Sequence, residues 1–206
     1  MIDVIEHYDK LIEENNDPFR DSKPLKDYMD KWDGQAFIDA MKLDKGKSVL
    51  EIGCGTGRIA IKTAPLCERL VGIDISSKTI ERASENLESL QNVKLICDDF
   101  MSCQFAEGFD VIYSSLTFMH IENKLTAIKK VASLLLGDGL FVVSIDKNQA
   151  DIIDMGTRKI KIYPDNPTDI QNFILQSGLT LATCYETEFA YIMVAKKPSS
   201  PEEGLA

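Results

Sequence analysis

The sequence predicts an α/β fold, a three-layer sandwich in which a mostly parallel β-sheet lies between two layers of helices. From residue 48 onward, short apolar segments alternate with longer segments whose apolar residues recur at helical spacing. Such alternation is typical of parallel strands joined by helices that cover both faces of a sheet. Near the end of the chain, two apolar segments follow each other with only a short turn between them, which adds an antiparallel strand. The length of 206 residues suits one domain of this kind.

The first 45 residues precede the alternating pattern and predict a helical cap. Apolar residues at helical spacing indicate an amphipathic helix over residues 3–14, which the Asn-Asn-Asp-Pro run at 15–18 ends. A second helix is expected to begin near Pro24, because proline is favoured in the first turn of a helix. The apolar stripe of this second helix continues past an interruption at Gly34.

The alternating region predicts five strands and three helices. Strands are expected at residues 48–52, 70–75, 93–97, 109–114 and 139–145. Helices are expected at residues 57–66, 77–90 and 123–136. Ser76 or Ser77 can cap the second of these helices, since a serine hydroxyl accepts a hydrogen bond from the first backbone N–H groups. The crossovers between parallel strands are expected to be right-handed.

The remaining segment predicts a helix followed by an antiparallel hairpin. Asn166 and Pro167 supply a cap and a first-turn proline, and Gly178 ends this helix. The two strands of the hairpin are expected at residues 179–186 and 190–195. The chain is thereby divided into three parts: a cap segment over residues 1–45, a core over residues 46–197 and a loose tail over residues 198–206.

The loop after the first predicted strand carries three alternating glycines, Gly53, Gly55 and Gly57. Glycine lets a chain turn tightly and lets a ligand approach the backbone closely. The strand before the loop carries an acidic residue, Glu51, near its end, and a helix is predicted after the loop. Units of this kind bind nucleoside-containing ligands at the carboxyl ends of parallel strands. The next strand ends with Asp74, close to the position, roughly 20 residues on, where a carboxylate that holds ribose hydroxyls is expected.

The spacing of the glycines distinguishes between nucleoside ligands. A dinucleotide-binding loop has the pattern G-x-G-x-x-G, whereas this loop has G-x-G-x-G. The antiparallel ending and the absence of a Tyr-x-x-x-Lys pair also count against a nicotinamide-dependent oxidoreductase. The loop therefore favours a different nucleoside ligand.

Residues 50–57, Leu-Glu-Ile-Gly-Cys-Gly-Thr-Gly, closely resemble motif I of the class I S-adenosylmethionine (SAM)-dependent methyltransferases. The resemblance continues, in order and in spacing, at residues 72–76, 93–100, 109–116 and 134–140. It implies SAM as the cofactor and a Rossmann-like sandwich whose seven-stranded sheet is mostly parallel, with the last strand antiparallel. It also implies that a methyl group is transferred to a small-molecule acceptor.

The same resemblance implies how the methionine and ribose moieties are held. Glu51 lies beside the methionine moiety, near its ammonium group, and Asp74 accepts hydrogen bonds from the ribose hydroxyls. A carboxylate forms a charge-assisted hydrogen bond with either kind of donor. Ile75 lies against one face of the adenine ring. The alternatives are a helix cap for Asp74 and an apolar core residue for Ile75.

The resemblance assigns the adenine to the end of the third strand, and the switch region at the end of the fourth strand is expected to hold the sulfonium. The Asp99 carboxylate accepts from the exocyclic amine of adenine, with Asp98 as the alternative if the register shifts by one residue. Phe100 offers a backbone N–H. Backbone groups at Ser114 and Ser115 line the sulfonium pocket, at the point where ligands bind in open α/β sheets.

Methyl transfer is an in-line displacement for which the protein mainly aligns the acceptor and excludes water, so neither a metal nor a catalytic triad is required. A general base helps if the acceptor is a hydroxyl or a protonated amine, and His120 is the candidate because imidazole accepts a proton near neutral pH. The alternative is a histidine that packs against or caps the next helix. Acceptor selection is expected to reside in residues 1–45 and 146–166.

The composition restricts the partners. A formal net charge of -10 and a pI near 4.7 argue against binding to a nucleic-acid backbone. Five cysteines without a C-x-x-C pair, and only two histidines, argue against a structural zinc site and favour a reducing compartment. We see neither a signal peptide nor an apolar stretch of 18 residues. A cytoplasmic enzyme with a small-molecule methyl acceptor is predicted; the alternative is a non-catalytic SAM-binding module.

Overall fold

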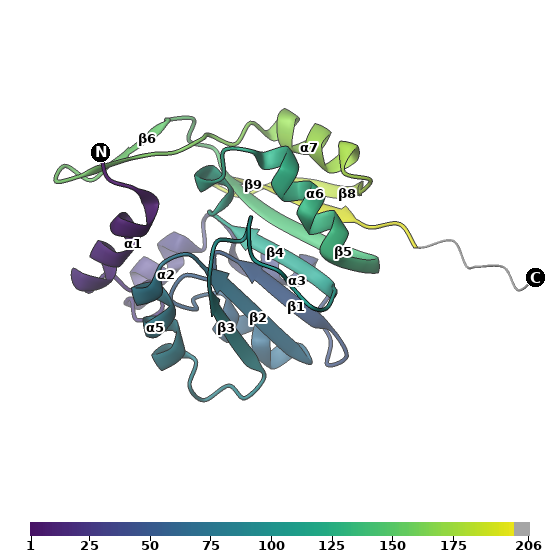
Figure 1. The fold of residues 1–206 in the computed structure, drawn as a ribbon, viewed down its shortest axis with the longest axis horizontal. Helices are drawn as coiled ribbons and strands as arrows, with labels where there is room; N and C mark the ends of the chain where they lie inside the picture. Colours follow the sequence, from purple (N-terminus) through teal and green to yellow (C-terminus); the bar gives the residue numbers. More distant parts are fainter. Residues whose placement is uncertain (200–206) are drawn as a thin grey trace, which may run out of the picture.

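The computed structural model describes residues 1–199 and contains a central seven-stranded β-sheet (Figure 1). Its spatial strand order is β3-β2-β1-β4-β5-β9-β8. The strands are β1 (Ser48–Ile52), β2 (Arg69–Asp74), β3 (Val93–Cys97), β4 (Phe109–Ser115), β5 (Leu135–Asp146), β8 (Thr180–Glu186) and β9 (Ala190–Lys196). Adjacent strands among β1 to β5 pair in parallel, whereas β9 runs antiparallel between β5 and β8. This arrangement confirms the predicted mostly parallel sheet with an antiparallel last strand.

Helices cover both faces of the sheet and complete the three-layer sandwich. On one face lie α6 (Lys124–Leu134) and α7 (Pro167–Gln176). On the other face lie α3 (Gly34–Ala40), α4 (Ala60–Thr63) and α5 (Ser77–Asn86). Leu50 and Ile52 of β1 pack on the α6 side, and Val49 packs on the α3 side. Because successive side chains of a strand point to opposite faces, Glu51 shares the α3 side with Val49.

Several helices end or begin differently from the prediction. The helix expected over residues 57–66 begins only at Ala60 and passes into a 3-10 turn, η1 (Ala64–Leu66), because Pro65 has no N–H to continue an α-helix. The helix expected over residues 77–90 ends at Asn86. β5 begins at Leu135, inside a segment expected to be helical, since this residue pairs with Phe109 of β4. At Leu135, strand pairing with β4 therefore outweighs the local helical pattern.

The amino-terminal segment forms three helices rather than two. α1 (Val4–Glu13) agrees with the helix expected over residues 3–14, and α2 (Lys23–Met29) begins at the predicted position. Gly34, with a φ of 69°, begins α3 as a separate helix. Phe37 and Met41 are fully buried in the core between α3 and the sheet. Of the three helices in residues 1–45, α3 therefore belongs to the sandwich, and the expected cap reduces to α1 and α2.

The segment between β5 and α7 contains a small hairpin that was not predicted. Its strands, β6 (Ile152–Asp154) and β7 (Lys159–Lys161), pair antiparallel outside the main sheet. The hairpin lies beside α1 (Figure 1), where the backbone N–H of Ile2 donates to the carbonyl oxygen of Lys159 at 3.0 Å. No helix within residues 1–199 is long and apolar enough to cross a membrane. Most of the tail expected over residues 198–206 lies outside the described residues.

Candidate active site

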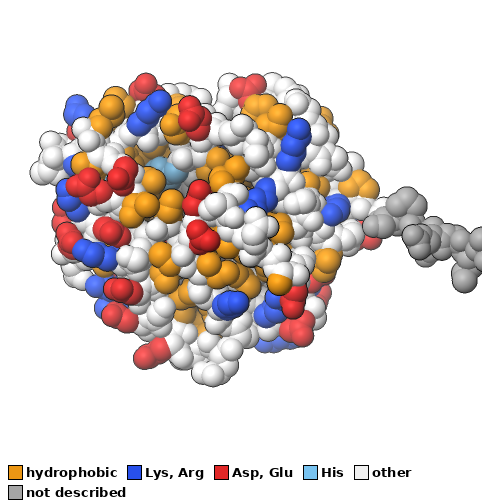
Figure 2. All heavy atoms as spheres, viewed as in Figure 1, with side chains coloured by type: hydrophobic (Ala, Val, Ile, Leu, Met, Phe, Trp, Pro, Cys, Tyr) orange, Lys and Arg blue, Asp and Glu red, His pale blue; other side chains and the backbone are white. Residues whose placement is uncertain are grey.

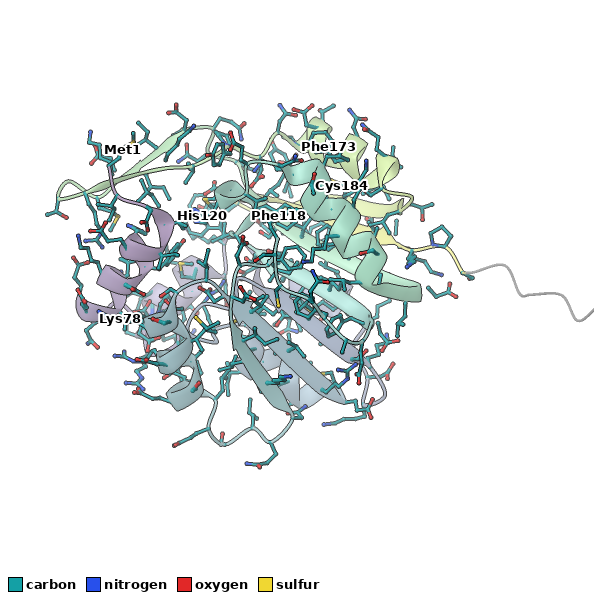
Figure 3. The ribbon with its side chains drawn as sticks, in the orientation of Figure 1. Met1, Lys78, Phe118, His120, Phe173 and Cys184 are labelled. Carbon is teal, nitrogen blue, oxygen red and sulfur yellow. The ribbon has the colours of Figure 1, made fainter. Side chains whose placement is uncertain are left out.

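A cavity of about 280 Å³ lies at the carboxyl ends of β1, β2 and β4. The glycine loop, the end of β2, residues 98–100 and residues 115–121 line it, and Tyr8 and Met29 cover it from α1 and α2. Figure 2 shows acidic and apolar side chains around a recess on this face, and Figure 3 places His120 there, between the sheet and α1. Ligands bind at this edge in open α/β sheets.

The three glycines of the loop have different surroundings, although all have positive φ values. A Cβ atom on Gly53 would overlap the side chain of Thr117, and one on Gly57 would lie 2.9 Å from Cδ1 of Leu87. A Cβ atom on Gly55 would meet no protein atom within 4 Å. Gly53 and Gly55 line the cavity, whereas Gly57 does not. Gly55 is thus open to a ligand, whereas Gly57 lets the loop pack against the end of α5, and its expected contact with the cofactor stays a prediction.

Asp74 lies at the end of β2 and lines the cavity. Its carboxylate accepts hydrogen bonds from the backbone N–H groups of Gly55 at 3.0 Å and Ser76 at 3.1 Å. Burial raises the pKa of Asp74 despite these bonds. The cap of α5 is Ser76, whose hydroxyl accepts from the N–H of Thr79, so the helix-cap alternative for Asp74 does not apply. Asp74 therefore joins the glycine loop to the start of α5 and faces the cavity.

Glu51 lies on β1 just before the glycine loop and contributes to the cavity wall. Its side chain is only 3% exposed, and one carboxylate oxygen accepts from the hydroxyl of Tyr113 at 2.9 Å. Burial raises the pKa of Glu51 to about 8. A buried carboxyl of this kind is suited to pair with a cationic group that enters the cavity.

The residues predicted to hold adenine are brought together at one end of the cavity. Ile75, Asp98, Asp99 and Phe100 all line it. Phe100 is also buried in the core, whereas both aspartates are exposed. The Asp99 carboxylate accepts from the N–H of Met101, and the Asp98 carboxylate accepts from the N–H of Asp99. Both residues line the cavity, so the choice between them stays open.

At the end of β4, the cavity is lined by Ser115 rather than by Ser114. Ser114 is fully buried, and its hydroxyl donates to the carbonyl oxygen of Ile52 at 3.0 Å. The hydroxyl of Ser115 donates to the carboxylate of Asp33 at 2.7 Å. Because neighbouring residues of a strand point to opposite faces, the side chain of Ser115 and not that of Ser114 is on the cavity side, and the expected contact of their backbone groups with the sulfonium stays a prediction.

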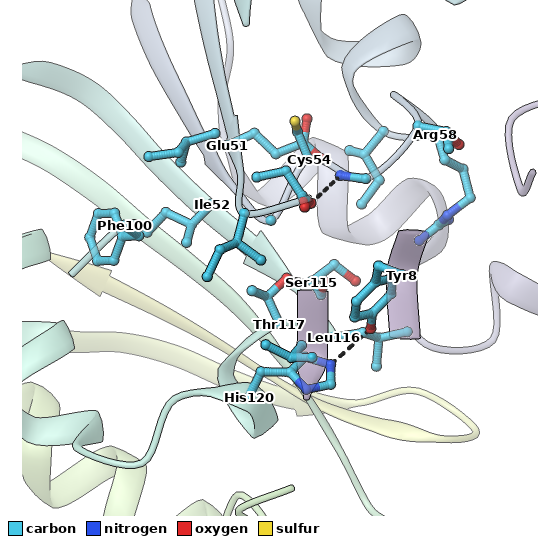
Figure 4. Close-up of a pocket in the computed structure, with 18 of the residues that line it drawn as sticks. Tyr8, Glu51, Ile52, Cys54, Arg58, Phe100, Ser115, Leu116, Thr117 and His120 are labelled. Carbon is cyan, nitrogen blue, oxygen red and sulfur yellow. Dashed lines mark hydrogen bonds between the residues drawn. The ribbon is translucent and has the colours of Figure 1, made fainter. Parts of the chain in front are cut away.

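His120 ends a short 3-10 helix, η2 (Phe118–His120), and lines the cavity. Its Nε2 atom lies 2.8 Å from the hydroxyl oxygen of Tyr8 on α1 (Figure 4). Burial, with smaller contributions from His7 and Lys124, lowers the pKa of His120 to about 4. The cap of α6 is Asn123, so His120 does not cap the next helix. The structure therefore presents an uncharged imidazole to the cavity.

Asp33 and Arg58 form a buried ion pair that the sequence did not reveal. Asp33 precedes α3, is 3% exposed, and accepts hydrogen bonds from both terminal nitrogens of Arg58. Burial opposes ionisation of Asp33, but Arg58 and the hydroxyl of Ser115 outweigh burial and lower the pKa of the carboxyl. Arg58 also lines the cavity. The pair ties the segment before α3 to the glycine loop, a contact between residues far apart in the chain that no local pattern indicates.

The segment over residues 146–166, expected to select the acceptor, contributes no residue to the cavity wall. Arg158 of this segment instead holds α1, where its guanidinium donates to both carboxylate oxygens of Glu14, at 2.5 and 2.7 Å. Its Nε atom also lies 3.2 Å from Nδ1 of His7. The amino-terminal segment does contribute to the cavity wall, as do Ser115, Leu116, Thr117, His120 and Ile121, and which of them select the acceptor stays a prediction.

Residues 43–186 match a protein family described as a methyltransferase domain. The chain belongs to this family. Together with the fold, the match identifies a class I SAM-dependent methyltransferase whose cofactor is SAM. Gly53, Gly55 and Asp74 line the cavity, and their contacts with the cofactor stay predictions.

Curated relatives and solved structures agree with this assignment. The methyltransferase is 28% identical over 207 residues to the ubiquinone biosynthesis O-methyltransferase of Glaesserella parasuis serovar 5, covering 90% of this chain and 82% of that protein. It is 34% identical over 113 residues to the 2-methyl-6-phytyl-1,4-hydroquinone methyltransferase of a Synechocystis species, covering 53% of this chain and 35% of that protein. The magnesium protoporphyrin IX methyltransferase of Synechocystis PCC 6803, solved with bound SAM, shares the fold with a TM-score of 0.74 and 18% identity, over 94% of this chain and 95% of that chain.

Proposed function

We propose that this methyltransferase transfers the methyl group of SAM to a hydroxyl oxygen of a small, largely apolar acceptor. The observation that carries the proposal is the Tyr8–His120 pair, which faces the cavity. Burial raises the pKa of Tyr8 and lowers that of His120, so both side chains are uncharged near neutral pH. Val4, Leu116 and Ile121 add apolar surface to the same part of the cavity. An uncharged, apolar wall with two hydrogen-bonding groups suits a neutral hydroxyl compound.

The name of one relative supports the choice of oxygen, since it is a ubiquinone biosynthesis O-methyltransferase. The name of another, a hydroquinone methyltransferase, supports a small aromatic acceptor. The formal net charge of -10 argues against a nucleic-acid acceptor. The cysteines are free throughout residues 1–199, which suits the reducing cytoplasm that we propose as the location.

We place the cofactor along the carboxyl edge of the sheet. Asp99 or Asp98 accepts from the adenine amine, and Ile75 lies against the ring. Asp74 accepts from the ribose hydroxyls, since its carboxylate already faces the cavity. Glu51 receives the ammonium of the methionine moiety, and the backbone at Gly55 approaches the cofactor closely. The sulfonium then lies towards Ser115.

The reaction needs alignment and one proton acceptor. The acceptor oxygen attacks the methyl carbon, the carbon–sulfur bond breaks, and its electron pair leaves on sulfur to give S-adenosylhomocysteine. His120 takes the proton of the acceptor hydroxyl. The acceptor oxygen therefore does not keep a positive charge when it is methylated. Closure of the cavity by α1 keeps water from the sulfonium and holds the acceptor in line.

The proposal is tested by the formation of S-adenosylhomocysteine with matched acceptors. Hydroquinones and phenols are expected to be methylated, whereas the same rings carrying an amine or an already methylated oxygen are expected to be inert. Turnover of the amines alone would contradict transfer to oxygen. Calorimetric binding of SAM without product from any acceptor would favour the alternative, a non-catalytic SAM-binding module.

A further inference from the structure

Glu51 and Tyr113 are direct neighbours across the central strands β1 and β4. Because the two residues are paired in register, their side chains lie on the same face of the sheet, on the side of α3 and α4. The hydroxyl of Tyr113 donates to Oε2 of Glu51 at 2.9 Å. Tyr113 is fully buried, so this bond forms away from water, where it is stronger than at the surface.

The hydrogen bonds continue from Tyr113 to α4, which follows the glycine loop. Oγ1 of Thr63 lies 2.9 Å from the hydroxyl oxygen of Tyr113 and 3.2 Å from the carbonyl oxygen of Ile59. A phenol has one proton to donate, so when Tyr113 donates to Glu51 its oxygen accepts from Thr63, whose single proton then points to Tyr113 rather than to the carbonyl oxygen of Ile59. Phe37 packs edge-on against the ring of Tyr113, with ring centroids 6.1 Å apart. The phenol is therefore held in one orientation.

Other groups around Glu51 act on it through their charge. Arg58, at the end of the glycine loop, favours the ionised carboxylate, and Asp33 and Asp74 disfavour it. Burial, and after it the charge of Glu51, raises the pKa of the Cys54 thiol. Among residues 1–199, Tyr113 is the one residue that donates a hydrogen bond to the Glu51 side chain. Tyr113 thus has a role that none of these neighbours duplicates.

We propose that Tyr113, held by Thr63, is a positioning residue that stabilises the ionised carboxylate of Glu51 and so sets the affinity of the protein for the ammonium group of SAM. The proposal rests on the placement of that ammonium beside Glu51 in the proposed function. Neither Tyr113 nor Thr63 lines the cavity, so both act through Glu51 rather than on the cofactor directly.

A consequence for pH follows from the burial of Glu51. Burial raises its pKa to about 8, and the bond from Tyr113 acts in the opposite direction. A pKa of about 8 means that the protonated form of Glu51 predominates in the free protein at pH 7, and that this form releases its proton to solvent when the cationic ammonium binds. The affinity for SAM is expected to increase as the pH rises towards and through about 8. Removal of the Tyr113 hydroxyl moves this increase to higher pH.

The test is calorimetric titration of the full-length protein with SAM between pH 6.5 and pH 9.5. Tyr113→Phe is expected to weaken binding by roughly ten- to a hundredfold at pH 7, the scale of a hydrogen bond to a charged group. This deficit is expected to shrink as the pH rises. Glu51→Gln measures any pH dependence that comes from the amine of SAM itself. A deficit of Tyr113→Phe that is equal at every pH, or no deficit at all, would overturn the proposal.

Variants of Thr63 keep the test decisive if Tyr113→Phe fails to fold. Thr63→Val keeps the shape of the side chain and removes the hydroxyl, so it is expected to shift the pH dependence in the same direction, by a smaller factor. Thr63→Ser, which restores the hydroxyl, is expected to recover the lost affinity. Equal affinities for these two variants at all pH values would contradict the positioning role. A wild-type protein whose pH dependence matches that of Glu51→Gln would instead show that the ammonium is not beside Glu51, which rejects the proposed cofactor placement.

Discussion

The hydroxyl of Tyr8 and Nε2 of His120 are 2.8 Å apart, although the residues are 112 positions apart in the chain. The contact joins α1 to the segment after β4 across the mouth of the cavity. It therefore combines two properties of the site, its closure by α1 and the presence of an uncharged imidazole inside it.

Replacement of Asp74 tests the proposed ribose contact. Asp74→Ala is expected to weaken SAM binding by about 1.5–3 kcal/mol, since hydrogen bonds to a charged group contribute on this scale. Calorimetry measures the affinity, and thermal unfolding reports on the loop, because Asp74 also accepts from Gly55 and Ser76. Asp74→Asn, which keeps the size of the side chain but removes its charge, is the matched variant. Unchanged affinity in a folded protein would reject the ribose role.

Replacement of Gly55 tests whether the loop touches the cofactor. Gly55→Val is expected to abolish SAM binding, because its side chain would enter the open space into which a Cβ atom points. Its φ of 53° adds a cost of about 1–2 kcal/mol to stability. Gly156→Val is the matched control: it has a φ of 76° and open space at Cβ, but lies in the β6–β7 hairpin. If both variants bind SAM equally well, the loop does not contact the cofactor.

Replacement of His120 tests general-base catalysis. His120→Gln is expected to lower turnover by roughly 10²–10⁴-fold with little change in SAM affinity. Since burial lowers the pKa of His120 to about 4, the acid limb of the pH–rate profile is expected near that value rather than near the usual value of about 6.5. The variant should lack this limb, whereas Tyr8→Phe, which leaves the imidazole in place, should keep it. A limb that persists in His120→Gln assigns the base to another group.

The lowered pKa of His120 also predicts a pH dependence of stability. Between about pH 6.5 and about pH 4, the unfolded chain binds a proton at His120 that the folded protein does not bind. The free energy of unfolding is therefore expected to be highest above this window and to fall as the pH drops through it. His120→Gln should reduce this fall in the free energy of unfolding. The fall that remains includes a contribution from His7, whose pKa is also lowered by burial. Urea unfolding at pH 7.5 and pH 5 measures the difference; equal losses in both proteins would contradict it.

Removal of α1 tests the closure of the cavity. Deletion of residues 2–14 is expected to leave a folded protein, because none of these residues belongs to the two large cores. Turnover is expected to fall by about a hundredfold or more, since the acceptor loses its alignment and water enters. Circular dichroism and the product assay measure the two effects.

Deletion of residues 1–40 is the contrasting case and is expected to prevent folding, because it removes the buried Phe37. Full activity without α1 would show that the cavity needs no cover.

Features that depend on local pattern were predicted well. Apolar runs such as Val49 to Ile52 identified the parallel strands, because a strand buried on both faces is apolar almost throughout. Asn166 and Pro167 marked the start of α7, since capping depends on neighbouring residues alone. The failures lie where tertiary contacts compete with local pattern. Leu135 joined a strand instead of a helix, and α3 packed into the core instead of the cap.

The sequence by itself determined the parallel sheet, the glycine loop at its carboxyl edge and the family to which the chain belongs, because these follow from short segments with fixed spacing. Only the tertiary structure decided which side chains meet in the cavity. It brought Tyr8 to His120, paired Asp33 with Arg58, and turned Ser115 rather than Ser114 towards the site. Each of these contacts joins residues that are distant in the chain or depends on the face of a strand. Their positions are set by the packing of helices on the sheet, which no local sequence pattern encodes.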